Sequence, residues 1–132
     1  MASFDTSERR PLSPHLQVYK VRFTMVMSIM HRITGVALYF AILIGVWWLT
    51  ALAAGPAYFG FVSGLFGSWF GLAVLFAAAY GLMHHLTGGV RHLIWDSGRY
   101  LTISAFEKMS IVSLAVSLGV VALVFLAGYA AS

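Results

Sequence analysis

The chain has 132 residues, of which 61% are hydrophobic and only 9% charged. A soluble domain of this size cannot bury so much apolar surface, so the composition excludes a soluble globular protein and indicates a membrane protein. The net charge is +4, but the basic residues do not form a nucleic-acid-binding stripe, and the absence of cysteine excludes disulfides, thiolate chemistry and cysteine-ligated iron–sulfur clusters.

Residues 1–20 are polar and contain Pro11 and Pro14, which disfavour a long helix, so we expect an N-terminal arm there. Residues 21–132 form the expected anchor domain, because three of its segments are apolar over the roughly 20 residues needed to cross about 30 Å of hydrocarbon. We predict an all-α integral membrane fold with helices at about 22–54, 61–95 and 105–131.

Local signals set the ends of these helices. Gly55 and Pro56 should end the first helix, and Ser97 and Gly98 the second, which is expected to start after residue 60. Either Thr102 or Ser104 should cap the third helix. If Ser104 is the cap, it would form a capping box with Glu107.

The basic residues flank the spans unevenly: they precede or begin the first span and surround the second connection, whereas residues 55–60 carry no charge. By the positive-inside rule, the N-terminus and the second connection are cytoplasmic and the C-terminus is periplasmic. No Ser/Arg-rich presequence precedes the first motif, so we expect a bacterial inner membrane.

Polar residues interrupt the apolar spans at matching helical spacing. Relative positions zero, three, four and seven place four residues on one face of the first helix and four on one face of the second. Antiparallel packing brings both faces to the same cytoplasmic half of the bilayer. The first set is Ser28, His31, Arg32 and Gly35; the second is His85, Gly88, Gly89 and His92, with His84 and Arg91 beside it.

Taken singly, these residues have ordinary explanations: Arg32 can extend to the headgroups, and His31 can be an interfacial histidine. Their accumulation favours a bound polar or anionic ligand, since each ionisable group costs up to about 2.5–3.5 kcal/mol in the membrane. Haem is the best candidate, because imidazole binds its iron, glycines admit a flat macrocycle and arginines suit its propionates. His85 is better placed than His84 as the axial ligand, and the second ligand is either His31 or a histidine of another subunit.

Two further roles are suggested by side-chain chemistry. Ser28 and Arg32, one turn apart, are able to hold a quinone carbonyl and stabilise negative charge on it. Asp96, near the aqueous side, is a candidate proton relay.

Three motifs together resemble one family: RPLSPHLQVY at 10–19, SIMHRITGV at 28–36 and HLTGGVRHLIWDSG at 85–98. They are similar to the cytochrome b membrane-anchor subunits of succinate dehydrogenase, or complex II, and the last span matches only in hydropathy. The resemblance implies that His85 is an axial ligand of haem b, with the other ligand from a sister anchor subunit. It also implies that His31 and Arg32 lie at the propionates and that Ser28 and Arg32 border the ubiquinone site.

The resemblance further places Arg91, His92 and Asp96 along the cytoplasmic edge, while the adjacent His84 leaves the identity of the ligand open. It implies partners: a second membrane subunit, completing the helical bundle, and iron–sulfur and flavoprotein subunits docked on the cytoplasmic side. Such a chain links the tricarboxylic acid cycle to the respiratory chain without oxidising succinate itself. The alternatives are a fumarate reductase anchor, a stand-alone haem electron carrier using His31 and His85, and a purely structural anchor.

Overall fold

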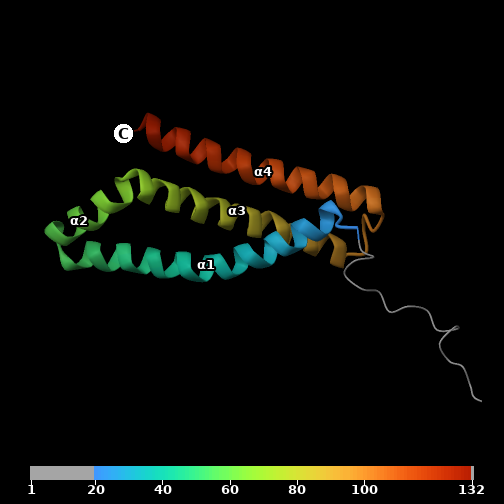
Figure 1. The fold of residues 1–132 in the computed structure, drawn as a ribbon, viewed down its shortest axis with the longest axis horizontal. Helices are drawn as coiled ribbons and strands as arrows, with labels where there is room; N and C mark the ends of the chain where they lie inside the picture. Colours follow the sequence, from blue (N-terminus) through green and yellow to red (C-terminus); the bar gives the residue numbers. More distant parts are fainter. Residues whose placement is uncertain (1–19, 132) are drawn as a thin grey trace, which may run out of the picture.

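The computed structural model describes residues 20–131, which form four helices joined by short connections (Figure 1). The helices are α1 (Phe23–Ala54), α2 (Pro56–Gly67), α3 (Trp69–Asp96) and α4 (Ile103–Ala130). The expected all-α fold is therefore confirmed for this part of the chain. The predicted N-terminal arm lies almost entirely outside the described residues.

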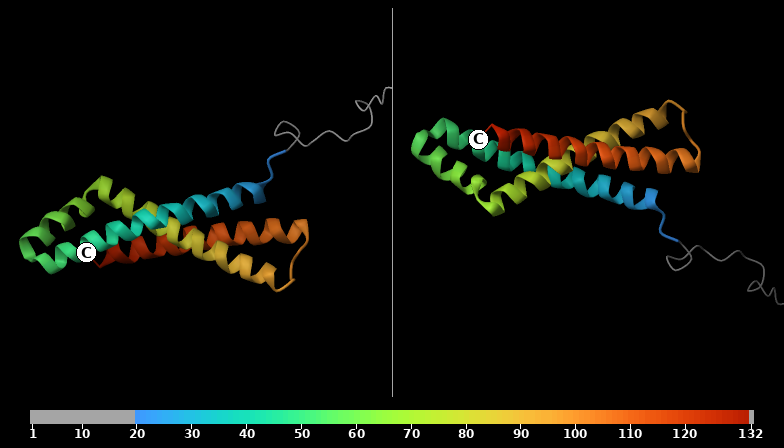
Figure 2. Two further views of the ribbon diagram at one scale, coloured as in Figure 1. Left: turned by 90° about the horizontal axis from the view of Figure 1, so that it is seen from below. Right: turned by 90° about the horizontal axis from the view of Figure 1, so that it is seen from above.

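The three long helices run alternately in opposite directions, with α3 between α1 and α4 in the view of Figure 1. Both α1 and α4 pack along α3, and α1 and α3 cross each other, as the two views of Figure 2 show. The N-terminal end of α1, the C-terminal end of α3 and the start of α4 consequently lie at one end of the bundle. Each long helix is apolar enough to cross a membrane, and the 32 residues of α1 span roughly 48 Å, more than the hydrocarbon requires.

The second span differs from the expected single helix over 61–95. Pro56 begins a separate helix, α2. Proline suits the first helical position, because the N–H that it lacks would have no hydrogen-bond partner within the helix. The chain then turns at Ser68, whose side chain caps α3 by accepting a hydrogen bond from the Gly71 amide at 3.1 Å. A Cβ at Gly71 would overlap the backbone of the preceding turn, so this tight turn requires glycine.

The other predicted helix ends agree with the structure. Gly55, with a φ of 115°, follows α1, and Gly98, with a φ of 76°, follows the end of α3. Thr102 caps α4 by accepting from the amide of Ala105 at 3.3 Å. Of the two proposed caps, Thr102 is the one used, and the capping box beginning at Ser104 does not form.

The interior of the bundle is more polar than its surface. Most large apolar side chains of residues 20–131 are exposed, as expected for surfaces that meet lipid or partner helices. Four hydrophobic residues in this range are buried, against six polar or charged ones: Thr34, His84, Arg91, Ser110, Ser113 and Ser117. Helix association here therefore depends on close packing and hydrogen bonds rather than on a hydrophobic core.

Candidate functional site

Three histidines meet between α1 and α3, and we call them the histidine cluster: His31, His85 and His92. The rings of His31 and His85 are stacked, with centroids 4.1 Å apart and planes 8° from parallel. His92 lies tilted against His31, with centroids 5.3 Å apart. The two polar faces predicted from sequence spacing meet in part: His31 and Gly35 of α1 approach His85 and Gly88 of α3. Ser28 and Arg32 of the first face do not join them.

Two reciprocal hydrogen bonds hold the stacked pair. Nδ1 of His85 donates to the carbonyl oxygen of His31 at 3.0 Å, and Nε2 of His31 donates to the carbonyl oxygen of His85 at 3.2 Å. Because a carbonyl oxygen can only accept, each of these nitrogens carries the proton. The lone pair of neutral His85 is therefore on Nε2, which has no hydrogen-bond partner within residues 20–131.

Each of the stacked rings lies over a glycine of the opposite helix. A Cβ at Gly35 would lie 2.9 Å from Cε1 of His85, and a Cβ at Gly88 would overlap the ring of His31. By contrast, a Cβ at Gly89 would meet nothing within 4 Å. The sequence predicts that Gly88 makes room for a macrocycle, but in this structure Gly88 makes room for the ring of His31.

Ser28 and Arg32 lie on α1 outside the histidine cluster. Arg32 is exposed and borders an apolar hollow of about 500 Å³ that is lined by α1 alone, including Ile33 and Phe40. Neither Ser28 nor Arg32 forms a hydrogen bond or ion pair with another described residue. Both polar groups are thus available to a ligand or a partner.

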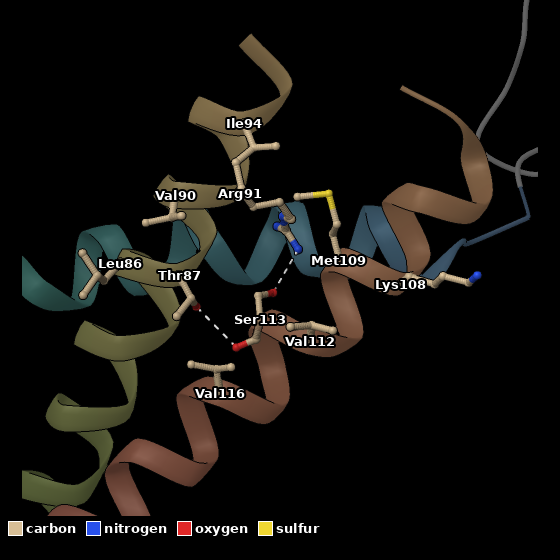
Figure 3. Close-up of a pocket in the computed structure, with 10 residues that line it drawn as sticks. All are labelled: Leu86, Thr87, Val90, Arg91, Ile94, Lys108, Met109, Val112, Ser113 and Val116. Atoms are coloured by element: carbon tan, nitrogen blue, oxygen red, sulfur yellow. Dashed lines mark hydrogen bonds between the residues drawn. The ribbon is translucent and has the colours of Figure 1, made fainter. Parts of the chain in front are cut away.

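A second polar contact joins α3 to α4, and we call it the serine seam: Thr87 and Arg91 of α3 with Ser110, Ser113 and Ser117 of α4. Nη1 of Arg91 donates to the hydroxyl oxygens of Ser110 at 2.9 Å and Ser113 at 3.3 Å. Thr87 and Ser117 share a hydrogen bond of 2.8 Å. Figure 3 shows Arg91 directed toward Ser113 on α4, so Arg91 faces the serine seam rather than the stacked histidines.

Arg91 is only 3% exposed, yet its charge has no carboxylate partner within residues 20–131. Its Nε is buried without a hydrogen bond, and its guanidinium lies 5.0 Å from the ring centre of Trp95. Hydroxyl groups and an aromatic face offset part of the cost of burying a cation. An anion nearby would offset the rest.

The adjacent histidines His84 and His85 have opposite environments. His84 is 1% exposed, and neither of its ring nitrogens has a hydrogen-bond partner; the ring of Tyr80 lies 5.6 Å away. His85 is partly exposed and is oriented by the carbonyl oxygen of His31. Neither the burial of His84 nor the serine seam was predicted from the sequence. The three seam serines, at relative positions zero, three and seven in an apolar segment, were a visible signal for the seam.

The remaining predicted residues lie at the end of α3. His92 is exposed, and its ring meets that of Trp95 edge to face at 5.1 Å. Asp96 is the last residue of α3 and is also exposed, with no ion pair to another described residue.

The donor set decides which cofactor the chain suits. Residues 20–131 contain no group of three or more side chains that would hold a bare metal ion. Haem iron, in contrast, needs only one imidazole from this chain. An imidazole that binds a metal usually donates its other N–H to a carbonyl or carboxylate. His85 meets this requirement through its bond to the His31 carbonyl, whereas His84 has no such orienting bond.

Comparison with known proteins agrees with this architecture. Residues 6–125 match the family described as succinate dehydrogenase/fumarate reductase transmembrane subunit. The succinate dehydrogenase cytochrome b556 subunit of Paracoccus denitrificans is 43% identical over 101 residues, covering 76% of this chain and 78% of that protein. The cytochrome b556 subunit of Rickettsia felis is 40% identical, covering 74% and 75%.

Similarity extends to mitochondria: the succinate dehydrogenase cytochrome b560 subunit of Bos taurus is 38% identical over 111 residues, covering 83% of this chain and 66% of that protein. The family match thus spans the histidine cluster, the whole of α1 and α3, and α4 as far as residue 125. The chain belongs to the family of succinate dehydrogenase and fumarate reductase transmembrane subunits, as a cytochrome b subunit of complex II.

Proposed function

We propose that this chain binds haem b through Nε2 of His85 and helps to form the ubiquinone-reduction site of succinate:quinone oxidoreductase. The observation that carries the proposal is the hydrogen bond from Nδ1 of His85 to the carbonyl oxygen of His31. This bond leaves the electron pair of His85 Nε2 free to bind iron. Bound there, haem b would take up and release single electrons close to the quinone.

A sister anchor subunit would supply the second histidine for the haem iron. His31 stacks on His85 at 4.1 Å and uses its Nε2 in a hydrogen bond, so the two rings are not arranged on opposite sides of one iron. This arrangement argues against the stand-alone carrier with both ligands in one chain. His31, Arg32 and His92 would supply cationic or N–H groups for the two propionates. Arg91, which the sequence also suggested for the propionates, is directed to Ser110 and Ser113 of α4 instead.

Ser28 and Arg32 would hold the carbonyl of ubiquinone. A hydroxyl and a guanidinium one helical turn apart donate hydrogen bonds to such an oxygen and stabilise negative charge as electrons arrive. Neither group is used within the described chain, which supports this role. Asp96, exposed at the end of α3, would pass protons from water to the reduced quinone.

The chain would reside in a bacterial inner membrane with its N-terminus cytoplasmic and its C-terminus periplasmic. It would pair with a second membrane subunit and dock the iron–sulfur and flavoprotein subunits at the end of the bundle that carries Arg22, Arg99 and Lys108. A fumarate reductase anchor is the second candidate, because the matching family includes both enzymes. The same residues serve electron flow in either direction.

Adjacent histidines provide a matched test of haem ligation. In the purified complex, His85→Ala should abolish or shift the haem b absorption spectrum. His84→Ala should leave the ligand field unchanged, because the ring of His84 lies near Tyr80 and is not part of the stacked pair. The absorption and electron paramagnetic resonance spectra of both variants provide the measurement. An unchanged spectrum in His85→Ala, or a shift confined to His84→Ala, would reject His85 as the ligand.

The quinone site is tested by separating two activities. Ser28→Ala and Arg32→Leu should each lower ubiquinone reduction by more than tenfold, while succinate oxidation with an artificial electron acceptor is retained. Thr50→Ala, an exposed hydroxyl on the same helix, serves as the control and should keep both activities. Equal loss of both activities would indicate defective assembly and count against a quinone-binding role.

A further inference from the structure

A groove runs along the surface between α3 and α4, with a volume of about 410 Å³. This volume is within the range of about 300–1,000 Å³ typical of ligand sites. Figure 3 shows the apolar side chains that face it from the two helices. They are Leu86, Val90 and Ile94 of α3 and Met109, Val112 and Val116 of α4.

Positive charge is found at one end of this α3–α4 groove. Lys108 lies near the start of α4, and Figure 3 shows its amine directed away from the apolar side chains of the groove. Arg91 contributes to the same groove beneath Met109. Neither cation forms an ion pair with another residue of the described range.

The groove has the dimensions of part of a lipid chain. The eight residue steps from Lys108 to Val116 correspond to roughly 12 Å along α4, entirely within the apolar span. At about 100° per residue, Val90 lies roughly 140° around α3 from His85. The groove is therefore on a different side of α3 from the histidine cluster, where the proposed function places the haem and the sister subunit.

We propose that the α3–α4 groove binds an anionic phospholipid, with one acyl chain along the apolar side chains and the phosphate at Lys108. The headgroup would also offset the charge of Arg91, which the serine seam leaves without a carboxylate partner. A helix of another protein would need to bring its own carboxylate to do the same. Basic pockets between membrane helices bind anionic headgroups for this physical reason. The site does not depend on haem or quinone.

The test uses the intact complex in nanodiscs containing equal parts phosphatidylglycerol and phosphatidylcholine, with native mass spectrometry of the lipids retained. The wild type should retain phosphatidylglycerol in preference to phosphatidylcholine, and Lys108→Gln should lower that preference by roughly fivefold, the value of one surface cation. Arg99→Gln removes an exposed cation from the connection outside the groove and should leave the preference unchanged.

Filling the groove provides an independent test. Val112→Trp should reduce retention of both lipids, whereas Leu123→Trp, exposed elsewhere on α4, should not. A photo-crosslinking residue at position 112 should label phospholipid. Equal retention of the two lipids by the wild type, equal effects of Lys108→Gln and Arg99→Gln, or crosslinking to a protein subunit would each overturn the proposal. An unchanged haem spectrum in Lys108→Gln separates this result from failure of the proposed function.

Discussion

Replacing Gly88 with alanine adds one methyl group where α3 comes closest to the ring of His31. The new Cβ would overlap that ring, so the ring must move. Its movement would break the 3.2 Å hydrogen bond from His31 Nε2 to the carbonyl oxygen of His85 and disturb the stack with 4.1 Å between centroids. The substitution therefore acts on the proposed ligand without changing it.

The magnitude follows from three effects. Overpacking typically costs about 1–3 kcal/mol, and a lost hydrogen bond between membrane helices about 0.6–2 kcal/mol. The higher helix propensity of alanine returns about 0.8–1.0 kcal/mol. We expect Gly88→Ala to destabilise the assembled subunit by about 1–4 kcal/mol.

The assay is thermal unfolding of the detergent-purified complex, followed together with its haem absorption spectrum. Gly89→Ala is the matched control, because a Cβ there meets nothing within 4 Å in this chain. Gly88→Ala should lower the unfolding midpoint and alter the haem spectrum. Gly89→Ala should not lower the midpoint and should leave the spectrum unchanged. If the two variants behave alike, the close approach of α3 to His31 does not exist in the assembled protein.

Two further substitutions test the packing around α3 with the same unfolding assay. Ser110→Ala removes the hydroxyl that accepts a 2.9 Å hydrogen bond from the buried Arg91, and it should lower the stability of the complex by about 1.5–3 kcal/mol. The control Thr50→Ala, at an exposed position, should have little effect. Equal unfolding midpoints for the two variants would contradict the serine seam. Gly71→Ala adds a Cβ that would overlap the backbone of α2, and it should lower the stability of the complex by about 1–3 kcal/mol. A Cβ at Gly64 would meet nothing within 4 Å, so Gly64→Ala serves as the control. Equal unfolding midpoints for the two variants would argue against the tight turn between α2 and α3.

The buried polar groups explain how a chain with so few buried apolar residues forms a defined bundle. In lipid, exposed apolar side chains cost nothing relative to buried ones, so apolar burial does not drive helix association. What distinguishes one helix pairing from another is whether polar groups find partners and whether small residues permit close approach. The histidine cluster and the serine seam do this on two different sides of α3.

Sequence spacing was sufficient to predict that His31 and His85 share a site. Helical period fixes which residues of one helix lie on the same face, and a short connection makes consecutive helices antiparallel. The helix ends at Gly55 and Gly98 were predictable for a similar reason, since they depend on local backbone conformation. The turn at Ser68 was not predicted, because its tightness depends on the approach of Gly71 to α2.

By itself, the sequence determined the membrane character, the three long helices and the meeting of His31 with His85, because these follow from composition and periodicity. Only the tertiary structure decided the partner of each polar group: Arg91 binds serines of α4, Gly88 accommodates His31, and the His31 carbonyl fixes the proton of His85 on Nδ1. Periodicity specifies a direction around one helix axis. The contact depends also on the crossing and rotation of the neighbouring helix, which packing alone sets.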